Sequence, residues 1–548
     1  MSTCSRPGSL LPFSAARALR PAQSASRALS GHRPGDNLRP LRVLTWMMTC
    51  SDRAAFKSSR KRILPSMPWP AHFFCSTGRA VSYCARPGIV NNQPRIMRTA
   101  APKSLQSRNG TINDLQKGDL PIHGWYRFVL SFPPHLVRQY IAKLKIGADD
   151  LLFDPFCGTG TTLVEAKQNR IPSIGCDAHP FAALVSRVKT NWTVDVKVLR
   201  ATLRRILRQA ETETSGHGLQ AISFDAALLQ EDGTPAPNGF RLTEDEEKLL
   251  PTGFLSQRPL QRLLILRNEI ERQKDAVHAE VYEFFLLALA HVIANGAGNF
   301  AFGPEIYRTK PKPDYDVLGH FARHADLMIA ELWASQVKGL QETTSSVYLD
   351  DARELKQIPD GISAVITSPP YPNEKDYTRT TRVESILLRL VVNRVNLREI
   401  KELLLRSNTR NVFFDDTDGE EVKEFVSIRR VCQEIERRRV ELHKDSGFER
   451  LYHKVVSHYF GGMRRHLRAL RPKLKRGAHL AYVVGDQLSF LMVPVATATL
   501  LAEVAESEGY RKIGCDLWRE RIGTKIRNSL TTEKTVRVRE EVLLLEKS

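Results

Sequence analysis

The sequence predicts an α/β fold, an open doubly wound sheet with a large helical insertion. Two short apolar runs, residues 151–153 and 363–366, are typical of buried parallel strands, and each leads into a turn of unusual composition. Between them, residues 195–345 show mostly helical spacing of apolar side chains. Because the carboxyl ends of parallel strands face the crevice where ligands bind, we expect both turns to lie in one cleft.

The chain is long enough for two or three domains, and its composition, 42% hydrophobic and 26% charged, is typical of a globular protein. The net charge of +21 is concentrated at the N-terminus, because residues 1–100 contain 16 Lys and Arg but 2 acids. This segment lacks a sustained period, so we expect a disordered basic tail. Three interpretations stay open: an organellar transit peptide, a nucleic-acid-binding arm, or a mis-assigned start with translation beginning near Met97.

The cysteine and hydropathy patterns argue against a disulfide framework, a metal site and a membrane-spanning helix. The eight cysteines form no Cys-x-x-Cys pair and no Cys/His cluster with zinc spacing, so we expect neither a disulfide framework nor a metal site. The longest apolar stretch, residues 284–302, is interrupted by His291, Asn295 and Asn299. Such interruptions favour a buried helix over a membrane span.

A glycine-containing turn, Asp-Pro-Phe-Cys-Gly-Thr-Gly at residues 154–160, joins the first strand to a helix that opens at Thr161. A second strand, residues 171–176, closes on Asp177, 19 residues after Gly158. That spacing suits a carboxylate that accepts hydrogen bonds from ribose hydroxyls, while glycines let the backbone approach a ligand. The sequence therefore predicts a nucleoside cofactor.

Two other glycine motifs fit less well. A phosphate-binding P-loop requires a lysine, and none occurs between Gly158 and Glu165. A dinucleotide fingerprint requires a third glycine where Leu163 stands. A further strand is predicted to run from Val347 to Asp351, and the Asp351 carboxylate either accepts from the adenine amine of the cofactor or caps the following helix.

The second turn, Thr-Ser-Pro-Pro-Tyr at residues 367–371, suits a flat ring that carries an exocyclic amine. The Ser368 hydroxyl and the Pro369 carbonyl can accept the two amine hydrogens, and Pro370 stiffens the turn. Tyr371 offers a ring for stacking, and a base in a duplex would have to leave the helix to reach it, at a cost of about a few kcal/mol. The alternative is a rigid loop without a chemical role. Since no cysteine neighbours the prolines, covalent attack on a cytosine ring carbon is not supported.

Together the two turns resemble the cofactor and catalytic motifs of S-adenosylmethionine-dependent DNA amino-methyltransferases, which have a Rossmann-like fold. Weaker similarities flank them at residues 131–137, 474–486 and 518–521. Within that family, Ser-Pro-Pro-Tyr is usual for cytosine N4 enzymes, whereas adenine N6 enzymes more often carry Asp or Asn first. The resemblance implies methyl transfer to an exocyclic base amine, with cytosine N4 preferred over adenine N6.

The resemblance also implies roles for individual residues. The methionine end of S-adenosylmethionine would be surrounded by Asp154, Phe156, Gly158, Gly160 and Thr161. Asp177 would hold the ribose and Asp351 the adenine. The catalytic residues would be Ser368, Pro369, Pro370 and Tyr371. Two features depart from many cytosine N4 enzymes: the cofactor turn precedes the catalytic turn, and a long insertion follows Asp177.

The predicted domains are the tail at 1–100, a cofactor-binding half at 120–195, a helical insertion at 196–345, and a catalytic half at 346–548 with an arginine-rich helical block at 384–470. The insertion and the arginine-rich block are the candidates for DNA reading. Expected partners are double-stranded DNA with a flipped target base and a cognate restriction endonuclease. We expect no membrane contact and a cytoplasmic, nucleoid-associated location in a prokaryote.

Two other functions stay open. An RNA guanine N2-type methyltransferase would carry a similar glycine turn, although residues 1–120 do not look like an RNA-binding domain ahead of the core. A non-catalytic DNA-binding protein on the same scaffold is the other alternative. The intact Ser-Pro-Pro-Tyr turn disfavours it, because a scaffold has no use for those side chains.

Overall fold

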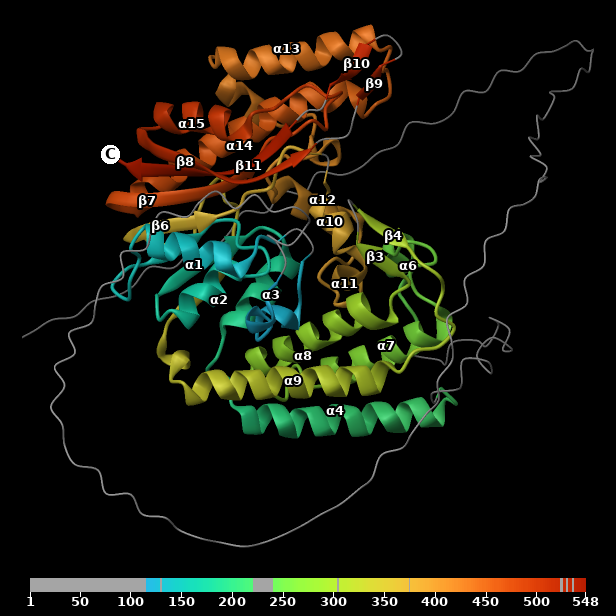
Figure 1. Cartoon of the computed structure of the whole chain (residues 1–548). Helices are drawn as coiled ribbons and strands as arrows, with labels where there is room; N and C mark the ends of the chain where they lie inside the picture. The colour runs from blue at the N-terminus through green and yellow to red at the C-terminus, as the bar shows by residue number, and fades with distance from the viewer. Residues whose placement is uncertain are drawn as a thin grey trace, which may run out of the picture. The chain divides into compact units, whose positions relative to one another are not determined.

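The computed structural model describes residues 115–128, 131–219, 240–302, 305–373, 375–522, 526–528, 531–534 and 537–548, so the tail predicted at 1–100 lies outside the described residues. The centre of the fold is a seven-stranded sheet with the order β5-β2-β1-β6-β7-β11-β8 (Figure 1). Its strands are β1 (Leu152–Asp154), β2 (Ser173–Asp177), β5 (Ser345–Leu349), β6 (Ile362–Thr367), β7 (Leu474–Gly485), β8 (Tyr510–Ile522) and β11 (Arg537–Lys547). With helices on both faces of this sheet, the predicted α/β fold is confirmed.

The strand order contains a topological switch point. Strands β5, β2, β1, β6 and β7 pair in parallel, while β11 pairs antiparallel with both β7 and β8. The chain leaves β1 for β2 and β5 on one side and returns to β6 on the other side of β1. The register pairs Phe153 with Val365, so the carboxyl ends of β1 and β6 lie next to each other. Open α/β sheets bind ligands at such a point.

Side chains of the central strands alternate between two helical layers. Leu152 and Ala364 pack in one cluster with α1 and α2, whereas Phe153 and Val365 pack in another with α14 and α15. The covering helices are α1 (Pro134–Lys143), α2 (Thr161–Gln168), α3 (Pro180–Thr190), α14 (Tyr452–Leu470) and α15 (Thr497–Ser507). This burial on both faces explains why the predicted strands read as continuous apolar runs.

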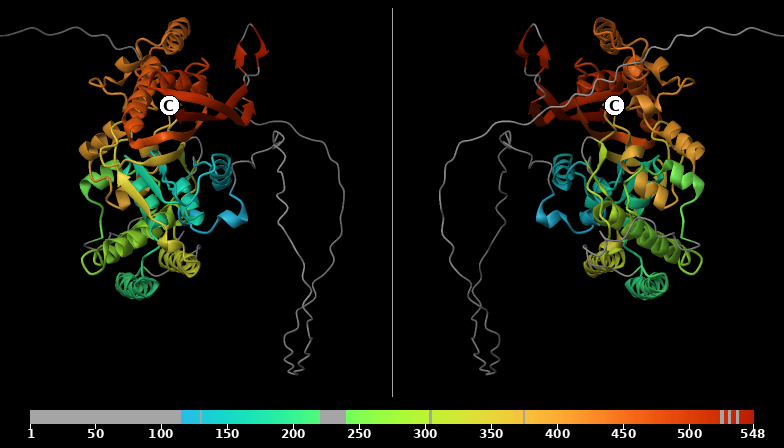
Figure 2. Two further views of the ribbon diagram at one scale, coloured as in Figure 1. Left: turned by 90° about the vertical axis from the view of Figure 1, so that its left-hand side faces the viewer. Right: turned by 90° about the vertical axis from the view of Figure 1, so that its right-hand side faces the viewer.

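The helical insertion shares a hydrophobic core with α3, to which Phe181 and Val188 contribute. It contains α4 (Val196–Gly216), α6 (Glu244–Leu249), α7 (Gln257–Glu271), α8 (Ala279–Val292), a π-helical turn (Ile293–Ala297), α9 (Val317–Val337) and a hairpin of β3 (Phe300–Phe302) and β4 (Ile306–Arg308). Helices α4 and α9 lie side by side (Figures 1 and 2). The mostly helical pattern predicted for this region is therefore present in its described part.

Helix α8 and the turn that follows it, Ala279–Ala297, are long and apolar enough to cross a membrane by length and composition alone. However, 61% of the most apolar window is buried inside the protein. Phe285 and Leu289 of this helix pack into the core of the insertion. The segment thus has the burial of a core helix, which is what its polar interruptions predict.

Between β6 and α14 lies the arginine-rich block. Its helices are α10 (Tyr377–Thr380), α11 (Arg382–Leu387), α12 (Arg394–Leu403), α13 (Val426–Glu441) and 3-10 turns at Thr409–Asn411, Asp418–Val422 and Glu449–Leu451. The remaining short elements are 3-10 turns at Lys117–Asp119, His123–Trp125, Leu340–Glu342 and Arg471–Lys473, and a hairpin of β9 (Ile526–Asn528) and β10 (Thr531–Lys534). Several arginines of the block, among them Arg389, Arg406 and Arg439, form ion pairs with carboxylates of the chain itself.

Candidate active site

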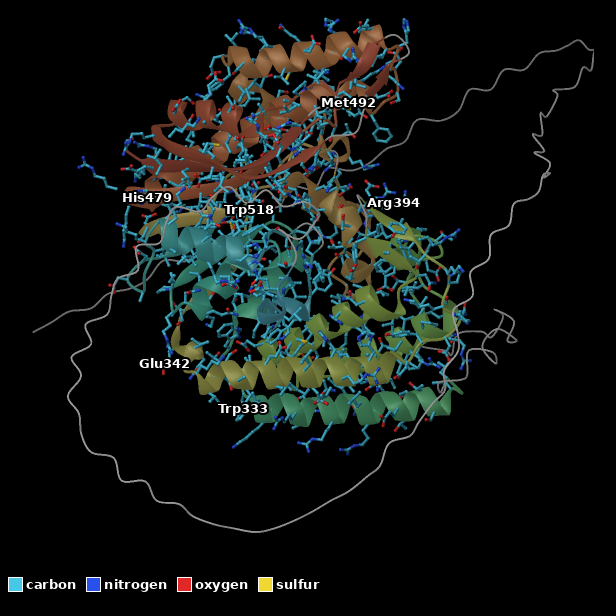
Figure 3. All side chains as sticks on the ribbon, in the orientation of Figure 1. Trp333, Glu342, Arg394, His479, Met492 and Trp518 are labelled. Carbon is cyan, nitrogen blue, oxygen red and sulfur yellow. The ribbon has the colours of Figure 1, made fainter. Side chains whose placement is uncertain are left out.

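A cavity of about 1010 Å³ lies at the switch point, where β1 and β6 end. Of the residues singled out in the sequence, it is lined by Phe156, Gly158, Thr161, Asp177, Asp351, Ser368, Pro369, Pro370 and Tyr371. Asp154 and Gly160 are not among its lining residues. Trp518 of β8 contributes to the wall as well (Figure 3). As expected, the two turns share one cavity, and its volume reaches the upper end of the range for a site that holds one small ligand, about 300–1,000 Å³.

Asp154 joins the ends of the two central strands from behind the cavity wall. The Thr367 hydroxyl donates to Asp154 Oδ1 at 2.6 Å, and the Phe156 backbone N–H donates to the same oxygen at 3.1 Å. The second oxygen, Oδ2, is buried and has no hydrogen-bond partner among the described residues. Burial raises the pKa of Asp154 to about 6. One of the two carboxylate oxygens of Asp154 therefore receives no hydrogen bond from the described part of the chain.

The glycine turn uses its two glycines for different purposes. Both have left-handed backbone angles, with φ of 51° at Gly158 and 82° at Gly160. Around Gly158 a side chain would meet no described atom within 4 Å, so the backbone is open toward the cavity. At Gly160 a Cβ atom would lie 3.1 to 3.3 Å from Ser186 of α3. Gly160 is thus required for packing at the start of α2, while Gly158 leaves room for a ligand.

Asp177 is held in place by the turn it faces. Its Oδ2 accepts from the Gly158 N–H at 3.0 Å, and its Oδ1 accepts from the His179 N–H at 2.8 Å. Burial nevertheless raises the pKa of Asp177 to about 6, because these two bonds do not offset the loss of solvation. The carboxylate lines the cavity and stays oriented toward it.

The Ser-Pro-Pro-Tyr turn is anchored to the neighbouring strand β7. The Ser368 hydroxyl donates to the Val483 carbonyl at 3.2 Å, which leaves the lone pairs of its oxygen as acceptors. The ring of Tyr371 lies against Gly485, where a Cβ atom would come within 3.1 Å of the ring. Burial raises the pKa of the Tyr371 hydroxyl, so it stays protonated at neutral pH. The turn therefore presents an acceptor and an aromatic ring on a stiff backbone.

Sequence reasoning missed His179 and Tyr377, which connect the two halves of the site. The Nδ1 atom of His179 caps α3 by accepting from the Phe181 N–H at 3.2 Å, and its Nε2 atom lies 3.3 Å from the Thr381 hydroxyl. Burial lowers the pKa of His179 to about 4. Tyr377 lines the cavity, with its ring centroid 5.7 Å from that of Phe128. His179-Pro180 ahead of an apolar run was a visible helix-start signal, but nothing local pointed to Tyr377.

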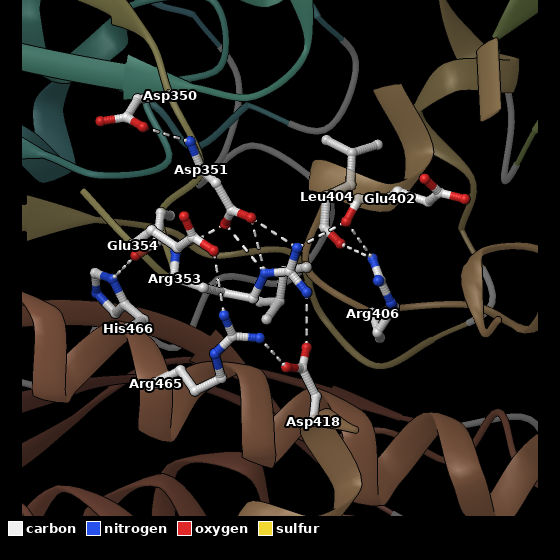
Figure 4. Close-up of polar contacts among 12 residues, drawn as sticks. Asp350, Asp351, Arg353, Glu354, Glu402, Leu404, Arg406, Asp418, Arg465 and His466 are labelled. Atoms are coloured by element: carbon white, nitrogen blue, oxygen red, sulfur yellow. Dashed lines mark hydrogen bonds and ion pairs between the residues drawn. The ribbon is translucent and has the colours of Figure 1, made fainter. Parts of the chain in front are cut away.

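Asp351 lies at the cavity with its carboxylate already engaged (Figure 4). The Arg353 N–H caps Asp351 Oδ1 at 2.8 Å, and the Arg353 guanidinium contacts both carboxylate oxygens at 2.7 to 3.1 Å. Asp351 thus lines the cavity, but no helix follows it among the described residues, where 352–354 form a turn; the alternative of a helix cap is wrong, and a contact with adenine stays a prediction. Among the described residues no group of three His, Cys, Asp or Glu side chains is arranged to hold a metal ion.

Comparisons with known proteins agree with this geometry. A family model described as DNA methylase matches residues 94–186. The type II methyltransferase M.BsoBI of Geobacillus stearothermophilus is 25% identical over 434 residues, covering 73% of this chain and 81% of that protein. M.AvaI of Nostoc is 23% identical over 420 residues, covering 71% and 79%.

Two further matches are partial. M.MjaII, a type II methyltransferase of Methanocaldococcus jannaschii, is 36% identical over 90 residues, and the match spans 16% of this chain and 17% of that protein. TrmN from Thermus thermophilus, a solved structure, matches with 11% identity and a TM-score of 0.22 over 76% of this chain and 49% of that chain, a similarity too low to add to the argument. The family match and the type II methyltransferases that align along most of its length support a DNA amino-methyltransferase of the N4/N6 family.

Proposed function

We propose that this protein transfers the methyl group of S-adenosylmethionine to an exocyclic base amine in double-stranded DNA, and that the amine is cytosine N4 rather than adenine N6. The observation that carries this proposal is the shared cavity. The glycine turn after β1 and the Ser-Pro-Pro-Tyr turn after β6 line it together. A methyl donor on one side and a flipped base on the other are what such a cavity can bring into contact.

The residues present fit the cofactor. The Asp177 carboxylate lines the cavity with a raised pKa, and the ribose hydroxyls of a ligand would add donors to its two backbone bonds, while the unpaired Oδ2 of Asp154 lies behind the cavity wall. We assign the methionine end to Asp154, Phe156, Gly158, Gly160 and Thr161. Asp177 would hold the ribose and Asp351 the adenine. Gly160 would act indirectly, since its role is to let the turn pack on α3.

When bound, S-adenosylmethionine supplies an electrophilic methyl group; the residues of this chain prepare the amine that receives it. The amine of an aromatic base is a weak nucleophile, because its lone pair is delocalised into the ring. Ser368 is committed as an acceptor, since its own hydrogen points to the Val483 carbonyl. The Pro369 carbonyl would accept the second amine hydrogen. These two bonds would draw the nitrogen toward tetrahedral geometry and free its lone pair.

The aromatic part of the site would hold the flipped base. Tyr371 lines the cavity with its ring close to Gly485 of β7, and we assign it to stacking on the base. Flipping costs about a few kcal/mol, which stacking and edge contacts help to recover. We prefer cytosine because Ser stands at the position where adenine enzymes of this family more often carry Asp or Asn.

The test is to express the full chain in a host without amino-methylated DNA bases, digest the DNA to nucleosides and identify them by mass spectrometry. We expect N4-methylcytosine, and we expect Ser368→Ala and Tyr371→Ala to abolish it. N6-methyladenine in its place would overturn the cytosine preference. Methylated guanine in RNA with unmodified DNA would overturn the whole proposal, and an unchanged cellular phenotype in both variants would favour a scaffold role.

We also propose a paired endonuclease, which the type II relatives favour. DNA from cells that express the chain should then resist an endonuclease that cuts at the methylated sequence. Sequencing the same DNA for modified positions would give that sequence. If the modified positions share no common sequence, the pairing is excluded.

A further inference from the structure

Arg353 occupies a buried position between the adenine side of the cavity and the arginine-rich block (Figure 4). Its Nε and Nη2 atoms contact the carboxylate of Asp351. Its Nη1 atom donates to Asp418 Oδ2 at 2.8 Å, and Nη2 also donates to the Glu402 carbonyl at 2.7 Å. Arg353 is 7% exposed and Asp418 is 1% exposed. One guanidinium thus joins three chain segments that are distant in sequence.

The Asp418 end of this contact is fixed from several sides. A Cβ atom at Gly461 of α14 would lie 1.7 Å from the Asp418 carbonyl oxygen, and one at Gly462 would lie 3.2 Å from Asp418 Oδ2. Two successive glycines therefore let the backbone of residue 418 rest directly on the helix. Arg465 of the same helix donates to Asp418 Oδ1 at 2.6 Å. Asp418 has little freedom to follow a movement of Arg353.

The Glu402 end leads into a wall of the cavity, residues 403–411. It is lined by Leu403, Leu404, Leu405, Ser407, Asn408 and Asn411. The buried Arg406 donates to the carbonyls of residues 401, 402 and 404, which holds the start of the wall in one conformation. The wall also contacts the loop after Tyr371, because the Asn373 N–H donates to the Ser407 carbonyl at 3.1 Å. Arg353 therefore contacts the residue that precedes this wall, and the loop after the Ser-Pro-Pro-Tyr turn contacts the wall itself.

A guanidinium is suited to this position in a way that an ammonium group is not. Its planar fork can contact a carboxylate with two nitrogens and still direct others at Asp418 and Glu402, whereas lysine offers one compact charge on a flexible stem. Loss of the fork would release the carboxylate of Asp351 from a fixed plane. It would also remove the donor of the Glu402 carbonyl, at the point where α12 ends and the wall begins.

We propose that Arg353 is a positioning residue that couples the adenine subsite of the cofactor to the wall at 403–411, which receives the target base. Occupation of either subsite then orders the other. This inference rests on the proposed function, because Asp351 is assigned there to the adenine; the wall is assigned to the base here, since it lines the same cavity as the Ser-Pro-Pro-Tyr turn. Coupling between two ligands of one protein is typically about 5- to 150-fold in affinity and is reciprocal.

Hydrogen–deuterium exchange on the full chain, with S-adenosylhomocysteine as the probe, tests the coupling without DNA. In the unmodified protein we expect the ligand to slow exchange both at 154–160 and at 403–411. In Arg353→Lys we expect the ligand still to bind by calorimetry and to protect 154–160, but the protection of 403–411 to be lost. Arg468→Lys is the matched control, since Arg468 lies on α14 and pairs with Glu421 and Glu508 at the surface; it should behave as the unmodified protein.

A second variant covers the case in which Arg353→Lys does not fold. Asp418→Asn keeps the size of the side chain and the Asp351–Arg353 contact, and we expect it to weaken protection of 403–411 in the same direction. In binding titrations, the affinity for DNA at saturating S-adenosylhomocysteine and the affinity for S-adenosylhomocysteine at saturating DNA should both fall by about the coupling factor, 5- to 150-fold.

The outcomes separate the two proposals. If the unmodified protein does not bind S-adenosylhomocysteine, the proposed cofactor site itself fails. If it binds the ligand but 403–411 exchanges at the same rate with and without it, or if both variants keep the protection, the coupling role of Arg353 is overturned and the proposed function stands.

Discussion

The carboxylates near the cavity fall into two groups, which differ in whether an arginine of the chain compensates for their loss of solvation. Asp154 and Asp177, at the ends of β1 and β2, have no cationic partner among the described residues, and burial raises the pKa of each to about 6. Asp351 and Asp418 are as well buried, and Arg353 pairs with both. For the neighbouring Asp416, burial is outweighed by the His458 bond and the charge of Arg406, which hold its pKa well below the usual range.

The presence or absence of a cationic partner distinguishes carboxylates that stabilise the fold from carboxylates that we expect to serve a ligand. A buried charge costs several kcal/mol unless it is paired, so folding normally provides the partner. Where the chain provides an arginine, as for Asp418, the carboxylate is part of the framework. Where the chain provides no cation and the carboxylate lines the cavity, as for Asp177, we expect it to interact with a ligand.

The largest effect on stability is expected from removing the shared arginine. Arg353→Met leaves Asp351 and part of Asp418 as uncompensated buried charges, and we expect the free energy of unfolding to fall by about 3–5 kcal/mol. Urea denaturation measures it. Arg437→Met on the exposed side of α13, which breaks two surface pairs, is the control and should leave the midpoint unchanged. Equal effects of the two substitutions would contradict the distinction drawn above.

Asp154→Asn should preserve the stability of the protein and lower its activity. The amide oxygen can keep the bonds from Thr367 and Phe156, and the uncompensated charge disappears, so the melting temperature should stay constant or rise. Methyl transfer should fall by about 100-fold, equivalent to about 2.7 kcal/mol of transition-state stabilisation. Both are measured on the same preparation by calorimetry and by a radiolabelled-methyl assay. Full activity in this variant would remove Asp154 from the proposed cofactor site.

A pH dependence of cofactor affinity should follow from the same carboxylates. The folded pKa of Asp154 and Asp177, about 6, lies above their ordinary value of 3.8, so the free protein holds more protons than the unfolded chain between these values. Their contribution to stability is full below about pH 3.8 and is lost as pH rises through 6. A ligand that donates to the ionised carboxylates should bind more tightly as pH rises from 5 to 7, by about tenfold per carboxylate.

Calorimetric titration with S-adenosylhomocysteine at pH 5, 6 and 7 measures this slope. Asp177→Asn should reduce it, whereas Asp418→Asn should not, because Asp177 lines the cavity and Asp418 does not. An affinity that does not change between pH 5 and pH 7 would mean that neither raised carboxylate contacts the ligand.

The smallest effect is expected where neither group of carboxylates is involved. A Cβ atom at Gly485 would lie 3.1 Å from the Tyr371 ring, so Gly485→Ala should displace the ring by a few tenths of an ångström. We expect kcat to fall a few-fold and the affinity for S-adenosylhomocysteine to stay the same. A change in that affinity would show that Tyr371 also shapes the cofactor side.

The sequence predicted what depends on local pattern. The strands expected at 151–153, 171–176, 347–351 and 363–366 correspond to β1, β2, β5 and β6, because buried parallel strands need continuous apolar runs. Strand β5 ends at Leu349, two residues before the predicted end. The acid at ribose spacing does face the glycine turn, since Gly158 donates to Asp177. These features follow from residues that lie close together in the chain.

What escaped prediction depends on contacts across the chain. Arg353 stands two residues after Asp351 in the sequence, yet its role is set by Asp418 and by the glycines of α14. Within 384–470, one of the two candidate regions for DNA reading, Arg406 is buried and paired with Asp416. Charge counts cannot distinguish such a residue from an exposed one. The placement of β11 between β7 and β8 likewise has no local signal.

The junction at Arg353 sets a rule for anyone who recombines this protein with a relative. Residues 351–353 belong to the strand-end loop of the core, but their partners come from the block that follows the Ser-Pro-Pro-Tyr turn. A chimera with a crossover between these segments would take Arg353 from one parent and the residues that it contacts from the other. Crossover points placed so that Asp351, Arg353 and residues 402–418 come from one parent should yield the viable hybrids.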